Sequence, residues 1–208
     1  MIGKSYPLFP LSDMVFFPRV ILPLHIFENR YQIMIKDMLA LPENERLICI
    51  TQLMANNKPN HIATIGKIIH HQSLTDGRSN IVLHGIQTVE IEELNDTITP
   101  YKQGKIINIR PEYWENENNK TTLTDKLLHS MNEFSKRSRI IVEDLNKIPA
   151  EDLLNGIIFT LQLSPLDKQQ LLNEQKLNIR LEELIKILNN IGYYTKYIPD
   201  NEIERGTN

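Results

Sequence analysis

The sequence predicts an α+β fold, in which a β-rich first half is followed by a helical second half. Three observations lead to this prediction. Short runs of strand-forming residues fill the chain up to about residue 110, and apolar residues at helical spacing fill it from about residue 123. A polar stretch, residues 112–120, lies between the two patterns. Strands and helices do not alternate singly, as they do in the parallel sheets of nucleotide-binding α/β folds.

The first half contains a brief extended segment, four predicted strands and one predicted helix. The extended segment is residues 6–11, where each proline fixes its own φ and keeps its predecessor out of the helical region. The strands rest on runs of β-branched and other apolar residues, at residues 47–51, 62–69, 81–91 and 105–109. Residues 26–40 carry apolar side chains at helical spacing instead. Asp76-Gly77 favours a tight hairpin turn. Gly85 interrupts a strand pattern and indicates a bulge or bend, as a closed or rolled sheet requires.

The second half contains four predicted helices. Three rest on apolar spacing, at residues 123–134, 153–161 and 177–188. The other begins at Ser164-Pro165-Leu166-Asp167, which supplies a cap, a proline in the first turn and an acid near the positive end of the helix dipole. We therefore expect three parts: a β domain with one helix at residues 1–114, a helical domain at 120–196 and a polar tail at 197–208.

Composition and charge exclude several classes of protein. Lys and Arg number 23 against 26 Asp and Glu, so the formal charge of −3 gives no general attraction to nucleic acid or to an anionic membrane surface. The single Cys49 cannot form an internal disulfide, and no signal segment follows Met1. No apolar run approaches the roughly 18 residues that would span a bilayer. These features predict a cytoplasmic protein without a membrane partner.

The motifs that would indicate an enzyme are missing from the sequence. There is no Gly-rich phosphate loop, no dinucleotide fingerprint and no serine nucleophile elbow. Cys49 lies in a predicted buried strand, where a thiol is usually inert. His70 and His71 are adjacent on a predicted strand and therefore point to opposite faces, so they do not form a metal site together. The sequence predicts no catalytic residue, no metal and no cofactor.

The apolar segment at residues 14–23 is the most unusual local feature. Pro18 and Pro23 disfavour a long central strand there, although nearly every neighbour is apolar. One interpretation is a buried loop that plugs the end of a barrel. The other is a partly exposed apolar groove or rim that accepts another chain. In that second interpretation the peptide-binding residues are four members of the segment, namely Phe16, Phe17, Arg19 and Ile21.

Several motifs resemble the N-terminal domain of Lon proteases. The opening signature consists of Pro7-Leu8-Phe9-Pro10-Leu11, Phe17-Pro18 and Leu22-Pro23-Leu24-His25-Ile26-Phe27-Glu28-Asn29-Arg30-Tyr31. Weaker markers follow in the family's order at Ile65-Gly66-Lys67-Ile68, Asp76-Gly77-Arg78, Gly85, Tyr101, Leu163-Ser164-Pro165-Leu166 and Arg180-Leu181-Glu182. The resemblance covers roughly residues 5–190. It departs from the family at Arg19 and Ala63, where the family usually has glycine, and at Thr88-Val89, which replaces the usual Arg-Phe.

The resemblance implies both a fold and a role. The fold would be a PUA-like β pseudo-barrel followed by a C-terminal helical bundle. The role would be recognition of unfolded or tagged protein segments by a stand-alone, non-catalytic module, since the family's ATPase and peptidase domains come after this region. Such a module would act as an adaptor in protein quality control or proteolysis, with a separate protease or ATPase as partner.

RNA binding is the alternative hypothesis, because PUA-like domains elsewhere bind RNA. It requires a basic face with stacking aromatic residues. The negative net charge and the lack of basic residues interleaved with aromatic ones disfavour it.

Overall fold

The computed structural model describes residues 1–95, 97–138 and 145–194, and its residues group into two compact units. Unit 1 comprises residues 1–112 and 154–175, and unit 2 comprises the described residues of 113–153 and 176–194. The predicted domains span residues 1–114 and 120–196, so they assign residues 154–175 to the helical domain and not to the first one. That the two domains fold separately stays a prediction. The predicted tail, residues 197–208, lies outside the described residues. The chain is mixed α+β, as expected.

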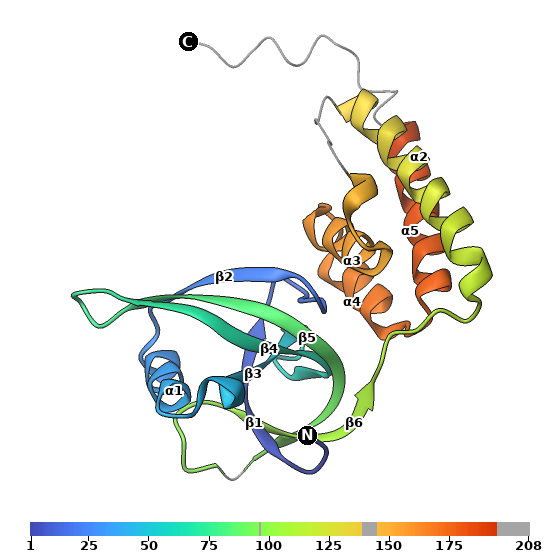
Figure 1. The fold of residues 1–208 in the computed structure, drawn as a ribbon. Coiled ribbons are helices and arrows are strands. Elements are labelled where there is room, and N and C mark those ends of the chain that lie inside the picture. The colour runs from blue at the N-terminus through green and yellow to red at the C-terminus, as the bar shows by residue number, and fades with distance from the viewer. Residues whose placement is uncertain (96, 139–144, 195–208) are drawn as a thin grey trace, which may run out of the picture. The chain divides into compact units, whose positions relative to one another are not determined.

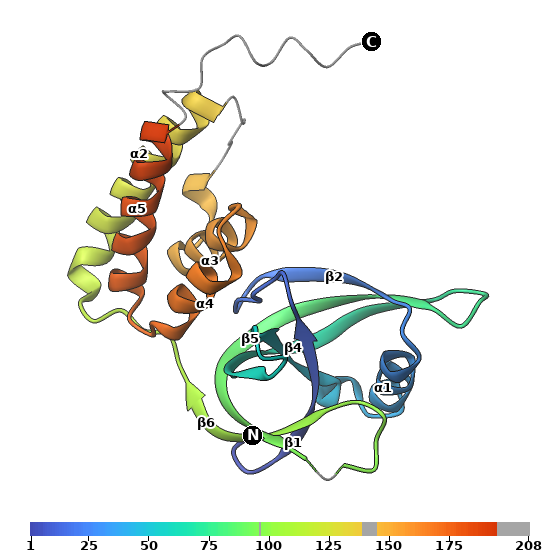
Figure 2. The ribbon, with the colours of Figure 1, turned by 180° about the vertical axis from the view of Figure 1, so that it is seen from behind.

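Unit 1 is built on a six-stranded sheet, counted over the described residues. The strands are β1 (Ser5–Leu11), β2 (Ile21–Ile26), β3 (Leu47–Leu53), β4 (Pro59–Ser73), β5 (Ser79–Leu94) and β6 (Gln103–Arg110). Five of them close into a ring (Figures 1 and 2), because β1 pairs in parallel with β3 and the pairs β3–β4, β4–β5, β5–β6 and β6–β1 are antiparallel. The four strands expected from the sequence are confirmed as β3 to β6, and the expected extended segment at residues 6–11 forms β1. Strand β2 was not predicted.

The interior of the ring is filled by apolar side chains from all five ring strands. They are Leu8, Cys49, Ala63, Ile65, Val89, Ile91 and Ile106, each at most 4% exposed. Such a cluster buries one face of every strand, and burial of apolar area is the main source of its stability.

Helix α1 (Asn29–Leu39) lies beside the long β4–β5 hairpin (Figure 1). It buries Tyr31, Met34, Ile35 and Met38, and the ring of Tyr31 stacks on Phe9 of β1 with centroids 4.2 Å apart. The hairpin turns at Gly77, whose φ of +85° suits glycine. The predicted helix and turn are therefore confirmed. A short 3₁₀ turn, η1 (Glu43–Glu45), leads from this region to β3.

Two further helices belong partly or wholly to unit 1. The unit boundary passes through α3 (Ala150–Thr160), and α4 (Pro165–Asn173) follows it. Ser164 caps α4 as predicted, because its Oγ accepts a hydrogen bond from the Asp167 N–H at 3.1 Å. Side chains join α4 to the strands: Gln169 Nε2 donates to the carbonyl of Ile62 at 3.3 Å, and Arg110 Nη2 donates to the carbonyl of Asn173 at 2.7 Å.

Unit 2 is helical. Its main pair is α2 (Lys120–Ser138) and α5 (Leu177–Tyr194), which pack side by side, with the short turns η2 (Glu117–Asn119) and η3 (Leu145–Lys147). The buried apolar side chains on their described residues are Leu123, Leu127 and Met131 on α2, and Leu177, Leu181, Leu184 and Leu188 on α5. None of the described helices is long and apolar enough to cross a membrane.

Candidate functional site

The aromatic residues of segment 14–23 lie inside unit 1. Phe17 is fully buried, and Phe16 packs against Gly66, where an added Cβ would come within 3.1 Å of its ring. The hydroxyl of Thr64 donates to the carbonyl of Phe16 at 2.6 Å. The predicted peptide contacts of Phe16 and Phe17 therefore have no support in this conformation, because buried side chains offer no surface. Their burial fits the other interpretation, a buried loop.

Gly85 allows this segment to lie directly against β5. The N–H of Arg19 donates to the carbonyl of Gly85 at 2.8 Å, and the N–H of Gly85 donates to the carbonyl of Val20 at 2.9 Å. A Cβ at position 85 would come within 2.2 Å of the Phe17 carbonyl oxygen, so only glycine fits. The register of β5 against β4 also shifts here, between Ile65 and Gly66. The bulge predicted at Gly85 is confirmed by that shift.

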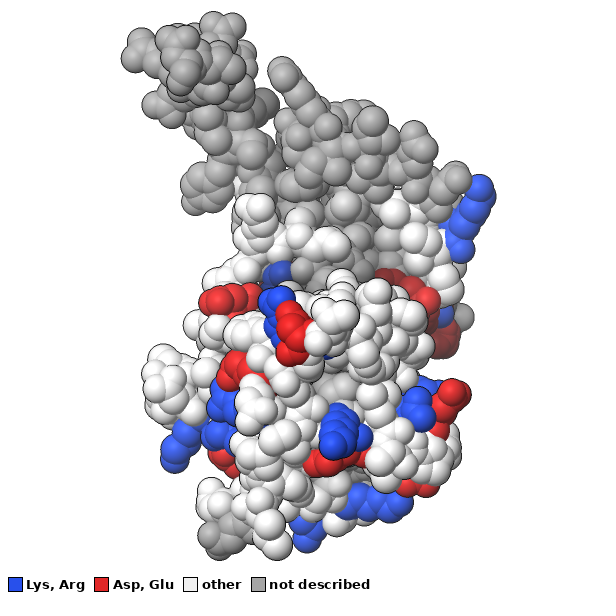
Figure 3. Space-filling view, turned by 90° about the vertical axis from the view of Figure 1, so that its left-hand side faces the viewer, with Lys and Arg blue, Asp and Glu red and all other residues white. Residues whose placement is uncertain are grey.

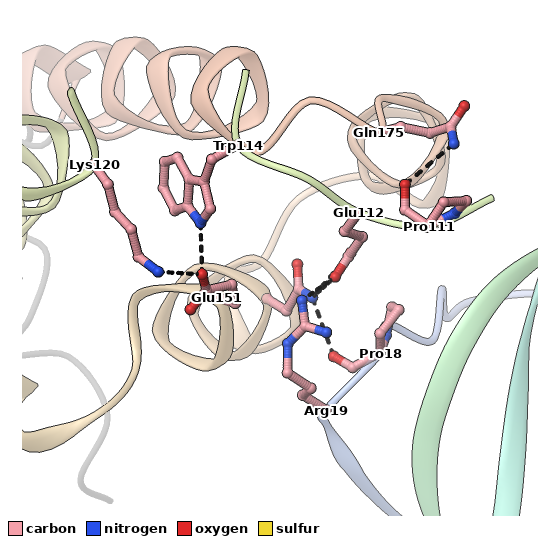
Figure 4. Close-up of polar contacts among 9 residues, drawn as sticks. Pro18, Arg19, Pro111, Glu112, Trp114, Lys120, Glu151 and Gln175 are labelled. Carbon is pink, nitrogen blue, oxygen red and sulfur yellow. Dashed lines mark hydrogen bonds and ion pairs between the residues drawn. The ribbon is translucent and has the colours of Figure 1, made fainter. Parts of the chain in front are cut away.

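Arg19 is held in a left-handed conformation by a polar network. Its φ is +66°, a region that glycine enters at little cost. Its guanidinium forms an ion pair with Glu112, whose side chain is only 4% exposed (Figure 4). Asn155 on α3 donates to the carbonyl of Pro18 and to Glu112 Oε1, both at 3.1 Å. The network fixes the turn that leads into β2.

Sequence reasoning missed Glu112 and Asn155. They lie 93 and 136 residues from Arg19, and no periodicity links positions so far apart. The one signal available was the residue type at position 19, an arginine where the Lon family usually has glycine.

Four residues from β2 onward form an exposed row, which we call the β2 strip: Ile21, Pro23, His25 and Phe27. Alternate residues of a strand face opposite sides, so Leu22 and Ile26 are buried while the strip is exposed. Ile21 is 49% and Phe27 63% exposed. His25 Nδ1 donates to Asn80 Oδ1 of β5 at 2.8 Å, and its ring stacks with that of Phe27.

The main-chain edge of β2 is less suited to binding than its side chains. Among the described residues β2 pairs with β5 alone, so its other edge is open. Pro23 lies in the middle of that strand and has no N–H to offer, and proline on an edge strand protects it from further pairing. Ligand contacts at β2 are therefore expected to come from the exposed side chains of the strip.

The described residues offer little for catalysis or metal binding. No group of three or more His, Cys, Asp or Glu side chains within them could hold a metal ion. Burial raises the pKa of the Cys49 thiol to about 12, so it stays protonated at neutral pH and is a poor nucleophile. Tyr101 is also kept neutral, since burial and its hydrogen bond to Asp37 raise its pKa to about 12.

The comparison with protein families shows to which family the chain belongs. Residues 5–190 match the model of the ATP-dependent protease La (LON) substrate-binding domain. The chain belongs to the Lon substrate-binding domain family. Two curated Lon family relatives are the Lon proteases of Buchnera aphidicola, 27% identical over 193 residues, and of Escherichia coli K12, 24% identical over 198 residues. Both alignments cover 88% of this chain and 24% of the relative, so the chain spans about a quarter of their length.

Solved structures of Lon domains share the fold. The N-terminal domain of a Mycobacterium avium complex Lon protease superposes with a TM-score of 0.70 at 18% identity, over 90% of this chain and 99% of that one. A Lon N-terminal domain protein from Xanthomonas campestris gives 0.64 at 19% identity, over 88% and 98%. The predicted Lon resemblance is therefore confirmed.

Proposed function

We propose that this chain is a non-catalytic module that binds unfolded or tagged protein segments. The observation that carries the proposal is the match of residues 5–190 to a substrate-binding domain family. The β2 strip supports it, because three of its four exposed side chains, Ile21, Pro23 and Phe27, are apolar, and exposed apolar patches mark interaction surfaces. Of the residues expected from the sequence to bind a peptide, Ile21 belongs to this strip and Arg19 lies just before it.

Binding at the strip should be weak and reversible. Burial of about 400 Å² of apolar surface gives about 10 kcal/mol at roughly 25 cal/mol per Å². Association costs about 4–15 kcal/mol in lost translational and rotational freedom, so most of this gain is cancelled. A module that holds clients transiently and releases them to another protein needs such a balance.

Two substitutions in the strip test this proposal. Ile21→Asp and Phe27→Asp place a charge on exposed positions, so the fold should stay intact while apolar contact with a client is lost. Binding of a reduced, carboxymethylated protein is measured by fluorescence anisotropy. We expect at least fivefold weaker binding for each variant.

Ile98→Asp is the matched control, since Ile98 is a fully exposed apolar residue in the loop before β6. It should bind like the wild type. If all three variants bind the client as tightly as the wild type, the strip is not the binding surface. If the wild type binds no unfolded client, the proposed function itself is refuted. Phe17→Asp is unsuitable here, because Phe17 is buried and the substitution would unfold unit 1.

The proposal also includes a cellular role and a fold type. The module would work in the cytoplasm as an adaptor in protein quality control, with a separate protease or ATPase as partner. Its ring of strands would correspond to a PUA-like pseudo-barrel, and its helical part to a helical bundle. RNA binding stays the alternative prediction. Figure 3 shows basic and acidic side chains interspersed over one face, which offers no continuous basic surface to a phosphate backbone there.

A further inference from the structure

A small polar pocket lies at a gap along one edge of β5. Strand β2 pairs with this strand as far as His84, and β6 pairs with it from Thr88 onward, so the register leaves Gly85, Ile86 and Gln87 outside both pairings. The pocket at this gap has a volume of about 180 Å³, and its polar lining comes from Arg19, Gln87, Thr88, Arg110 and Glu112.

Thr88 Oγ1 and Arg110 Nε, which belong to this lining, are buried and have no hydrogen-bond partner among the described residues. The two residues are directly opposite each other on β5 and β6, so their side chains lie on the same face of the sheet. Thr88 is only 1% exposed. Its neighbour across β4, Thr64, is equally buried but bonds to the Phe16 carbonyl. Buried polar groups normally have a hydrogen-bond partner, so these two adjacent groups are available to an oxygen atom that enters the pocket.

The size and charge of the pocket restrict that ligand. Sites for drug-sized molecules and cofactors have volumes of about 300–1,000 Å³, so this one fits a small group rather than a nucleotide. Arg19 and Arg110 carry two positive charges against one negative charge on Glu112, which favours a monoanion and disfavours a doubly charged phosphate. An arginine N–H and a hydroxyl both donate to an oxygen atom, and charge-assisted bonds from arginine favour carboxylate.

We propose that this pocket binds a carboxylate of the client segment, with Arg110 Nε and Thr88 Oγ1 as donors. The inference rests on the proposed function, because it assigns the carboxylate to a bound protein segment. The place of the pocket supports this: Arg19 lines it, and Ile21 of the β2 strip follows two residues later. A segment could therefore lay apolar side chains on the strip and insert either a side-chain carboxylate or its C-terminal carboxylate into the pocket.

Three small probes distinguish these two sources in the full 208-residue chain. N-acetylglutamate α-amide carries only a side-chain carboxylate, N-acetylglutamine carries only an α-carboxylate, and N-acetylglutamine amide carries neither. The Arg110 Nε–H resonance is followed by NMR during titration with each probe. We expect saturable shifts with at least one carboxylate probe and none with the neutral amide.

Substitutions at Thr88 link the binding to the pocket. Thr88→Val removes the hydroxyl at nearly constant shape and should weaken carboxylate binding at least fivefold, while Thr88→Ser keeps the hydroxyl and should retain it. Thr75→Val, on the exposed tip of the β4–β5 hairpin, is the control. The same shift with all three probes, no shift with any probe, or unchanged binding in Thr88→Val would overturn the carboxylate site, and the pocket would then hold water.

The outcomes of this titration and of the client-binding assay are separable. Client binding that depends on the β2 strip without any carboxylate shift would leave the proposed function standing and refute the pocket. Carboxylate-dependent shifts without binding of any unfolded client would establish the anion site. They would also refute the proposed function and the assignment of the carboxylate to a client segment.

Discussion

At the scale of single residues, two buried threonines on neighbouring strands have opposite roles. Thr64 Oγ1 donates to the Phe16 carbonyl, whereas Thr88 Oγ1 has no partner. Thr64→Val should therefore lower the free energy of unfolding by about 1–3 kcal/mol, because it leaves a buried carbonyl unsatisfied. Thr88→Val should leave it unchanged or raise it, since an unpaired buried hydroxyl is removed. Urea denaturation of both variants without ligand measures the difference, and equal losses would contradict it.

Arg19 combines a conformational cost with an electrostatic gain. Arg19→Gly and Arg19→Ala both lose the ion pair with Glu112, which should cost about 1–3 kcal/mol, between the values for exposed and buried pairs. Only glycine adopts the φ of +66° freely, so Arg19→Gly should be about 1 kcal/mol more stable than Arg19→Ala. Thermal unfolding of the two variants tests this order. The reverse order would show that the left-handed backbone does not cost stability here.

At the scale of elements, two glycines show how closely other parts of the chain approach the strands. A Cβ at Gly85 would meet the main-chain carbonyl of Phe17, whereas a Cβ at Gly104 on β6 would meet the end of the Leu8 side chain at 2.8 Å. Side-chain ends move more cheaply than backbone. Gly85→Ala should therefore cost more than about 3 kcal/mol in urea denaturation, and Gly104→Ala only about 1–2 kcal/mol. Similar losses of unfolding free energy in the two variants would mean that the backbone of segment 16–19 can shift at little cost.

The elements also show what sequence patterns can and cannot predict. Ring strands and main helices were predictable because each buries one face, and burial leaves a period of two or about 3.6 in the sequence. Strand β2 was missed because Pro18 and Pro23 disfavour a central strand, while an edge strand tolerates proline. The predicted peptide contacts differ in exposure: Ile21 is exposed, whereas Phe16 and Phe17 are buried. An apolar run alone cannot show which of its faces is exposed.

At the scale of the whole chain, sequence order and compact units do not coincide. The chain leaves unit 1 after Glu112 and returns at Leu154, and the returning part supplies Asn155 and Gln169, which bond to the Pro18 and Ile62 carbonyls. A boundary placed where the composition changes, near residue 114, cannot reveal this return. Helices that are neighbours in sequence can bury their apolar faces against different partners, and the spacing of apolar residues does not identify the partner.

The stability of the whole chain should fall in alkaline solution. Burial raises the pKa of Cys49 from its ordinary value of 9.0 to about 12, and burial with the Asp37 hydrogen bond raises that of Tyr101 from 10.0 to about 12. Each group holds its proton more tightly in the folded chain than in the unfolded one. The contribution of each group to the free energy of unfolding is therefore complete below its pKa in the unfolded chain. It is lost as the pH rises toward 12, its pKa in the folded chain.

Cys49→Ala separates the part that comes from the thiol. From pH 9 upward, the free energy of unfolding of the wild type should fall more steeply than that of Cys49→Ala, by up to about 1.4 kcal/mol for each pH unit. Urea denaturation at a series of pH values measures both slopes. Below pH 8 the two proteins should differ by a constant amount, which reflects the packing lost with the sulfur atom. Parallel curves up to pH 11 would show that Cys49 ionises equally easily in both states, against its place in the core of the ring.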